Sequence, residues 1–220
     1  MRRLLLLRPE PGLSESVERA RALGIEALSC PLFQVEPVEW AAPDPELYDG
    51  LLLTSPNAAR HAGVELRRIS KLPVYAVGAK TAATARDAGL EVAATGSAGV
   101  AALLESVPES LNLLHLAGAD RRERAGRHRI DRLTVYRSAP IADPGLPELA
   151  GLVVAVHSPR AGARLADLAA GRSTTAIAAI STAAAEACGA GWERVESAAS
   201  PDDARLLALA ATLCQTSPPR

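Results

Sequence analysis

Two Ser-Pro pairs, each placed directly after an apolar run, are the residues of this sequence whose types and spacing most suggest a binding site. Ser55-Pro56 follows LLLT, and Ser158-Pro159 follows VVAVH. A serine hydroxyl accepts a hydrogen bond from an amide in the first turn of a helix, and proline fits the first helical position because its missing N–H would be unpaired there. Each pair therefore predicts the start of a helix, and the repetition suggests a site that is built twice.

Other polar residues and a glycine follow apolar runs in the same way. In parallel α/β sheets, ligands bind beyond the carboxyl ends of the strands, where helix N-termini present free amides and a partial positive charge to anions. We therefore expect an anionic ligand to be bound there by backbone amides and hydroxyls. The candidate residues at such ends are Ser55, Asn57, Gly78 and Thr81 in one half of the chain, and Ser158, Arg160, Ser181 and Thr182 in the other.

Short apolar runs alternate with helical patterns through almost the whole sequence, which predicts α/β architecture with parallel sheets flanked by helices. Ser14 and Ser200 are the expected N-caps of the first and last helices, with Pro201 at the first helical position of the latter. The expected strands are 4–7, 26–30, 51–54, 74–77, 91–95, 113–117, 153–157, 175–180 and 193–198. The expected helices are 14–24, one from Pro56, 81–89, 100–107, one from Pro159, 181–189 and 200–214.

An internal repeat predicts two Rossmann-like lobes. Residues 51–89 parallel residues 153–189 at an offset of about 100, and each copy reads strand, Ser-Pro helix, strand, small-residue helix. The extended, proline-containing stretches 33–40 and 133–140 are the natural crossovers between the lobes. We expect lobe one to comprise 1–37 plus 139–220, and lobe two to comprise 38–138.

The charged residues favour an anionic ligand over nucleic acid. The formal net charge is -1, yet every basic residue except Lys71 and Lys80 is arginine, whose planar fork suits carboxylates and phosphates. Arginines are densest in the segment 119–132, which reads either as a solvated helix face or as a contact with an anionic ligand. Nucleic acid is disfavoured, because no aromatic residues are interleaved and the chain as a whole is not basic.

The remaining reactive residues give no recognised metal or nucleophile pattern. Three widely separated cysteines suggest reduced thiols in a cytoplasmic protein, and the four histidines show no metal-ligand spacing, so we expect no metal. His157 precedes Ser158, but Thr54 takes the equivalent place in the first copy, which argues against a His–Ser nucleophile. The opening MRRLLLL is too short for a signal peptide, and no stretch reaches the length of a membrane span, so we expect no membrane contact.

A set of motifs in a fixed order resembles uroporphyrinogen-III synthases over nearly the whole chain. The set is TSPNA, VGAKTA with its following Gly89, VYRS, HSPRAG and the closing GWERVESAASPDDARLLALA. The resemblance implies two Rossmann-like lobes joined by a pair of extended strands, with the first lobe made of both chain ends. The second copy departs from the family, because IST replaces the pattern seen in VGAKTA, which leaves open whether Ser181 or Thr182 faces the ligand.

The resemblance also implies an activity that needs no cofactor. The substrate would be hydroxymethylbilane, a linear tetrapyrrole with eight carboxylates, and the product uroporphyrinogen III, formed with loss of water and inversion of the last ring through a spiro intermediate. Tyr136 in VYRS matches the tyrosine to which the family's general-acid role is usually given, or it simply packs beside the site. Thr54 joins the candidate lining, and Arg8 is an expected carboxylate contact. We further expect a monomer, with transient contact to the preceding pathway enzyme.

The alternative is a two-lobed, non-enzymatic binding protein for a small anionic ligand. Architecture by itself does not exclude it. However, the sequence shows neither an export signal nor a DNA-binding segment of the kind that a transcriptional sensor carries.

Overall fold

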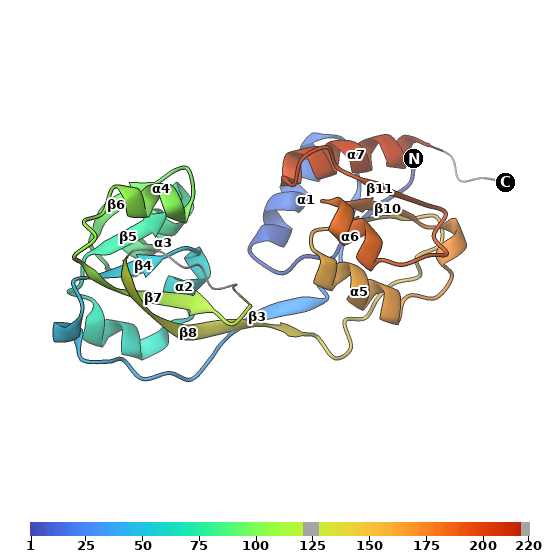
Figure 1. Ribbon diagram of the computed structural model, residues 1–220. Coiled ribbons are helices and arrows are strands. Elements are labelled where there is room, and N and C mark those ends of the chain that lie inside the picture. The colour runs from blue at the N-terminus through green and yellow to red at the C-terminus, as the bar shows by residue number, and fades with distance from the viewer. Residues whose placement is uncertain (121–127, 217–220) are drawn as a thin grey trace. The chain divides into compact units, whose positions relative to one another are not determined.

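The computed structural model describes residues 1–120 and 128–216, and the chain divides into two compact units (Figure 1). Unit 1 comprises Met1–Gln34 and Ala139–Arg220, and unit 2 comprises Val35–Ser138. Each unit contains one sheet, with five strands in unit 1 and six strands in the sheet of unit 2. The α/β class expected from the alternating pattern is confirmed.

The sheet of unit 1 is parallel throughout and has the order β11-β10-β9-β1-β2. Three of its strands are buried along their whole length, which explains their unbroken apolar sequences. Its strands are β1 (Leu4–Leu6), β2 (Ala27–Ser29), β9 (Val153–Val156), β10 (Ala176–Ala179) and β11 (Arg194–Ser197).

Helices cover both faces of this sheet (Figure 1). Successive strand residues point to opposite faces, so Leu4 and Leu6 pack beneath α1 and α7, whereas Leu5 and Leu7 pack beneath α5 and α6. The helices are α1 (Gly12–Ala22), α5 (Pro159–Leu168), α6 (Thr182–Ala187) and α7 (Asp203–Gln215), and a short 3-10 helix, η3 (Arg172–Thr174), precedes β10.

The sheet of unit 2 has the order β3-β8-β7-β4-β5-β6. Strands β4 to β8 pair in parallel, and a register shift between Ala117 and Gly118 interrupts the β7–β8 pair. The strands are β3 (Phe33–Pro37), β4 (Gly50–Leu53), β5 (Val74–Val77), β6 (Val92–Gly96), β7 (Asn112–Gly118) and β8 (Arg129–Pro140).

Helices again lie on both faces of this second sheet. One face packs on α2, α3 and η2 through Leu51, Leu53 and Leu114, and the other packs on α4 through Leu52 and Leu113. The helices are η1 (Pro45–Leu47), α2 (Pro56–His61), η2 (Gly63–Ile69), α3 (Ala79–Asp87) and α4 (Val100–Glu105).

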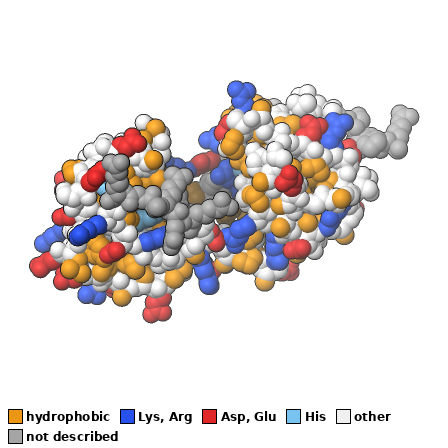
Figure 2. All heavy atoms as spheres, viewed as in Figure 1, with side chains coloured by type: hydrophobic (Ala, Val, Ile, Leu, Met, Phe, Trp, Pro, Cys, Tyr) orange, Lys and Arg blue, Asp and Glu red, His pale blue; other side chains and the backbone are white. Residues whose placement is uncertain are grey.

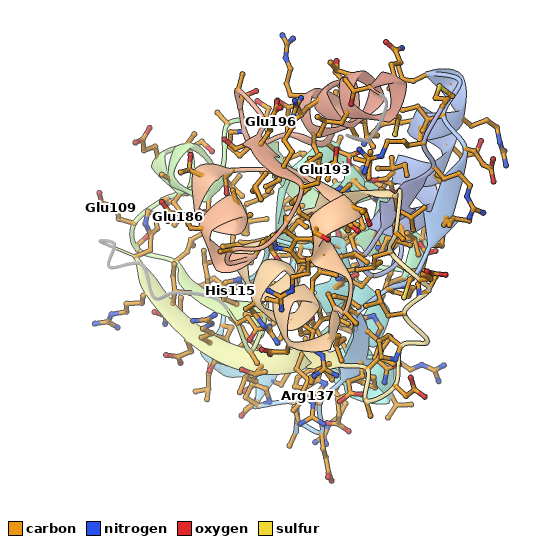
Figure 3. All side chains as sticks on the ribbon, turned by 90° about the vertical axis from the view of Figure 1, so that its right-hand side faces the viewer. Glu109, His115, Arg137, Glu186, Glu193 and Glu196 are labelled. Atoms are coloured by element: carbon orange, nitrogen blue, oxygen red, sulfur yellow. The ribbon has the colours of Figure 1, made fainter. Side chains whose placement is uncertain are left out.

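Two neighbouring strands, β3 and β8, carry the chain between the units. The amide of Val38 donates to the carbonyl of Val135 at 3.0 Å, and Arg137, labelled in Figure 3, forms an ion pair with Glu36 at 2.6 Å. The extended stretches at 33–40 and 133–140 are therefore paired strands.

A buried arginine joins the amino-terminal ends of the strands of unit 1. Arg2 donates to the carbonyls of Gly151, Leu152 and Thr174, and its guanidinium forms an ion pair with Glu193 at 2.8 Å. Only 5% of the Arg2 side chain and 10% of the Glu193 side chain are exposed. This network ties the first residues of the chain to β9 and to the segment before β11.

Two expected helix starts are wrong. Helix α1 begins at Gly12 with Pro11 as N-cap, because Glu10 accepts hydrogen bonds from the amide and hydroxyl of Ser14 and thereby satisfies the first turn. Helix α7 begins at Asp203 with Asp202 as N-cap, and Ser200 only donates to the Asp202 carboxylate at 2.6 Å.

Several other properties of the described residues bear on function. Cys30, Cys188 and Cys214 are free and buried, and burial raises the pKa of the last two thiols to about 11. Within the described ranges, no helix is both long and apolar enough to cross a membrane. On the visible face of each unit, basic side chains are interspersed with acidic ones (Figure 2).

Candidate functional site

Three serines that follow strands cap the next helix, and for Ser55 and Ser158 the Ser-Pro pattern predicts it. Ser55 accepts a hydrogen bond from the amide of Asn57 at 3.3 Å, and Ser158 accepts one from the amide of Ala161 at 3.2 Å. Ser181 repeats the arrangement in α6 at 3.3 Å. In each case the hydroxyl oxygen is the acceptor, so its own O–H stays available to donate to a ligand.

The prolines and the residues after the caps complete this arrangement. Pro56 and Pro159 take the first helical positions, as expected. Thr182, the first residue of α6, is exposed, whereas Ser181 is half-buried. Arg160 is exposed, and its guanidinium carbon lies 4.7 Å from the centroid of the Phe33 ring.

A polar cluster that sequence reasoning missed lies at the carboxyl ends of β1 and β9. The Oδ1 atom of Asp203 accepts hydrogen bonds from Ser16 at 2.8 Å, from Arg8 at 3.1 Å and from His157 at 2.8 Å. Arg19 forms an ion pair with the Oδ2 atom. Burial raises the pKa of Asp203, but the hydrogen bonds from His157, Ser16 and Arg19 outweigh it and hold the pKa well below its ordinary value. Asp203 is thus an anion shared by four donors.

His157 is almost enclosed, with 8% of its side chain exposed. Burial lowers its pKa, and Arg8 adds to that effect against the opposing influence of Asp203. Because Asp203 is ionised, Nε2 carries the proton that the carboxylate accepts. Nδ1 is buried and has no well-aligned hydrogen bond to any described residue, although the backbone of Ala155 is close enough to favour its protonation slightly. His157 therefore donates its Nε2 proton to Asp203 and is not a base that activates Ser158.

In unit 2, Thr54 pairs with a histidine. Its Oγ1 lies 3.1 Å from Nε2 of His115, the half-buried β7 residue labelled in Figure 3. Leu53 of β4 pairs with Leu116 of β7, so Thr54 leaves the sheet beside the end of β7. Sequence reasoning missed His115, because only the register brings it next to Thr54.

Two further expected residues follow β5. Gly78 is the N-cap of α3, with a φ of 86°, and its amide donates to the carbonyl of Gly96 at 2.7 Å. Only glycine adopts that φ without strain, which explains its place there. Thr81 is 3% exposed and packs into the unit, so its side chain supports α3 and is not presented at the surface of unit 2.

Tyr136 lies against the backbone of Gly118. A Cβ placed on Gly118 would come within 2.6 Å of Cε2 and 3.0 Å of the hydroxyl oxygen of Tyr136. The register shift in the β7–β8 pair places these two residues opposite each other. The His61 ring is the other neighbour, with its centroid 6.3 Å from that of Tyr136. The half-buried tyrosine is thus seated at the carboxyl end of β7.

The structure brings the expected residues together in two groups. Arg8, Ser158, Ser181 and their neighbours follow the strands of unit 1, and Thr54, Ser55, Asn57, Gly78 and Tyr136 follow those of unit 2. Of the arginine-rich segment 119–132, residues 121–127 lie outside the described part of the chain, and Arg129 and Arg132 belong to β8. Among the described residues, no three His, Cys, Asp or Glu side chains are grouped to hold a metal.

Comparison with known proteins identifies what this arrangement is similar to. Residues 14–208 match the family model described as uroporphyrinogen-III synthase HemD. A protein of Archaeoglobus fulgidus named "Putative uroporphyrinogen-III synthase" is 37% identical over 83 residues, which are 36% of this chain. The match spans 33% of that relative, about a third of its length.

A solved structure extends the similarity to the fold. The crystal structure of uroporphyrinogen-III synthetase from Helicobacter pylori 26695 superimposes with a TM-score of 0.67 and 16% identity. The superposition covers 97% of this chain and 100% of that chain. These findings support the resemblance read from the motifs, and they do not support the alternative of a non-enzymatic anion-binding protein.

Proposed function

The chain belongs to the uroporphyrinogen-III synthase family, and from this premise we propose that it converts hydroxymethylbilane into uroporphyrinogen III. The observation that carries the proposal is the family match over residues 14–208. The enzyme would be a hydro-lyase of tetrapyrrole synthesis, because water leaves while the ring closes. We propose that it acts in the cytoplasm as a monomer, without a cofactor, membrane or nucleic acid, and meets the preceding pathway enzyme only transiently.

The substrate's charge fits the donors at the strand ends. Hydroxymethylbilane carries eight carboxylates, and anions are bound by hydroxyls, backbone amides and arginine forks. Ser55, Ser158 and Ser181 each keep an O–H to donate after capping a helix. Arg8 and Arg160 add positive charge in unit 1. Thr54, Asn57, Gly78 and Thr182 would complete the lining through hydroxyl, amide or backbone groups, and Thr81 would act by holding α3 in place.

The chemistry requires a proton donor near the leaving hydroxyl. Protonation releases water from the methylene of the first pyrrole and leaves an electrophilic azafulvene. The last pyrrole attacks it through its substituted carbon to give a spiro intermediate. The bond that already joined this carbon to the preceding methylene then breaks, and that methylene bonds to the unsubstituted α carbon of the same ring. Loss of a proton from that carbon restores the pyrrole and leaves the macrocycle closed with the ring inverted. We assign the donor role to Tyr136, whose hydroxyl is a general acid in reach of a bound ligand at the carboxyl end of β7. Holding the chain folded so that the substituted carbon attacks is an orientation effect.

An isomer assay tests this function directly. Freshly generated hydroxymethylbilane is supplied to the protein, the products are oxidised, and the type I and type III porphyrins are separated. The expected result is predominantly type III, whereas the enzyme-free control closes to type I. A product mixture identical to the control would reject the synthase assignment. An anion-binding protein without activity would still bind uroporphyrin but leave the isomer ratio unchanged.

A further inference from the structure

Arg8 uses only one nitrogen of its guanidinium inside the protein. Nη1 donates to Oγ of Ser16 and to Oδ1 of Asp203, both at 3.1 Å. Within the described part of the chain, Nε and Nη2 make no hydrogen bond. The side chain is 28% exposed. The edge formed by Nε and Nη2 is one of the two edges by which arginine binds a carboxylate with two parallel hydrogen bonds.

Gly12 makes room for that edge. A Cβ built on Gly12 would lie 2.5 Å from both Nε and Cζ of Arg8, and closer still to Nη2. Gly12 is the first residue of α1, and its φ lies outside the left-handed region that favours glycine. Its backbone would therefore accept alanine, and the space occupied by the Arg8 guanidinium is what calls for a glycine here.

The polar cluster around Asp203 holds Arg8 in place but does not cancel its positive charge. Asp203 receives Ser16 and His157 at 2.8 Å, and the Ser16 side chain is fully buried. Among the described residues in contact with one another here, the charged groups are the cations Arg8 and Arg19 and the anion Asp203. Burial keeps His157 neutral at pH 7, so the cluster retains one positive charge. An incoming anion would find a held guanidinium with uncompensated charge.

We propose that the Nε–Nη2 edge of Arg8 binds one carboxylate of the substrate, and that Gly12, Ser16 and Asp203 are positioning residues that present this edge. The proposal rests on the synthase function for the identity of the substrate. It adds that Arg8 contributes a fixed fork and not merely a charge. It also gives Asp203, the first residue of α7, a part in ligand binding through Arg8.

The decisive variant is Gly12→Ala, because it removes no charge and no hydrogen-bonding group. Alanine favours the helix over glycine, and this gain offsets part of the cost of displacing the partly exposed Arg8 side chain, so the stability toward urea should stay close to that of the wild type. The added methyl displaces the guanidinium, so KM for hydroxymethylbilane should rise roughly tenfold to hundredfold, the range expected for losing charge-assisted hydrogen bonds, with kcat nearly unchanged. Arg8→Ala should raise KM at least as much, and Arg8→Lys should restore only part of the loss because lysine lacks the fork.

Adjacent carboxylates provide a matched control. Asp203→Asn weakens the hold on Arg8 and should raise KM, whereas Asp202→Asn weakens only the cap of α7 and should leave KM unchanged. A KM for Gly12→Ala equal to that of the wild type would overturn the positioning role. A wild-type KM for Arg8→Ala would overturn the carboxylate contact itself.

Calorimetric binding of uroporphyrin III separates this proposal from the synthase function, because it is measurable even if the wild type forms no type III isomer. A weaker Kd in Gly12→Ala and Arg8→Ala than in the wild type would support the fork regardless of turnover. Equal Kd values in the three proteins, or no binding of uroporphyrin III by the wild type, would overturn it.

Discussion

Tyr136 and Gly118 are in contact so close that position 118 admits no side chain. A Cβ there would come within 2.6 Å of the tyrosine ring, and the shifted register of β7 and β8 sets the two residues opposite each other. The backbone of Gly118 therefore fixes the position of the Tyr136 ring. A fixed ring suits a hydroxyl that must donate a proton to a leaving group.

Gly118→Ala should consequently impair catalysis by moving Tyr136. The methyl must displace the ring or the strand, an overpacking that costs about 1–3 kcal/mol of stability. We expect a lower kcat and more type I isomer. The check is a double-mutant cycle: in a Tyr136→Phe background, Gly118→Ala should reduce kcat much less. Equal effects in both backgrounds would show that Gly118 acts independently of the hydroxyl.

Tyr136→Phe tests the acid role itself. Loss of a general acid typically costs 10²–10⁴ in rate, and we expect about 10² here because the substrate loses water unaided. Product affinity, measured by calorimetry, should stay at the wild-type value. Turnover at the wild-type rate would remove the Tyr136 hydroxyl from the mechanism and leave the residue as packing beside His61.

Ser158 offers a substitution that separates capping from ligand binding. Aspartate caps a helix about as well as serine, so Ser158→Asp should keep the stability of α5, whereas Ser158→Ala should lose about 1 kcal/mol. The aspartate also adds a negative charge that repels substrate carboxylates, so KM should rise far more in Ser158→Asp than in Ser158→Ala. Urea unfolding and initial rates give the two quantities, and an unchanged KM in Ser158→Asp would place the substrate away from α5.

The buried His157 should make stability depend on pH near neutrality. Its pKa in the folded protein is lowered, chiefly by burial, so below about pH 6.5 the unfolded chain binds a proton that the folded chain does not. Stability should therefore fall as the pH drops from 7.5 towards 5.5. His157→Gln should flatten that decline in urea titrations. The charged groups that face position 157, Arg8 and Asp203, are unchanged in this variant. Burial also lowers the pKa of His61 in unit 2, so His61→Gln should flatten part of the same decline.

The ion pair of Arg2 and Glu193 should be a pure stability element. Both side chains are at least nine-tenths buried, and removing one partner leaves an uncompensated charge, which costs about 3–5 kcal/mol. Glu193→Gln should lower the free energy of unfolding by that order, whereas kcat and KM measured well below the melting temperature should not change. A shifted KM would show that the amino-terminal ends of the unit 1 strands also contribute to substrate binding.

Features set by neighbours in the sequence could be predicted, and those set by distant partners could not. Ser55 and Ser158 were identified as caps because the hydroxyl, the proline and the amide they serve lie within one helical turn. The role of Asp203 could not be predicted, because its partners Arg8 and Ser16 lie at the other end of the chain. Nothing in the sequence marks Gly118 as special. A side chain is excluded there only because the strand register places Tyr136 opposite it.

Competition between local hydrogen-bond acceptors explains the remaining errors. Ser14 had the right type and place for an N-cap, but the Glu10 carboxylate bonds its amide and hydroxyl and the helix starts earlier. Ser200 likewise lost to Asp202, a stronger acceptor two residues on. The carboxylate contacts of Arg8 and Arg160 and the acid role of Tyr136 stay predictions until ligand is bound.

The strand order of unit 1 has a consequence for synthesis on the ribosome. Strand β1 lies between β9 and β2, and its partner Val154 in β9 is made about 150 residues after Leu5. Unit 2 is translated in between as one uninterrupted stretch and can fold while β1 still lacks that neighbour. The all-leucine strand β1 thus lacks its β9 partner during most of synthesis, and a pause or truncation before β9 would leave it open to aggregation or to chaperones.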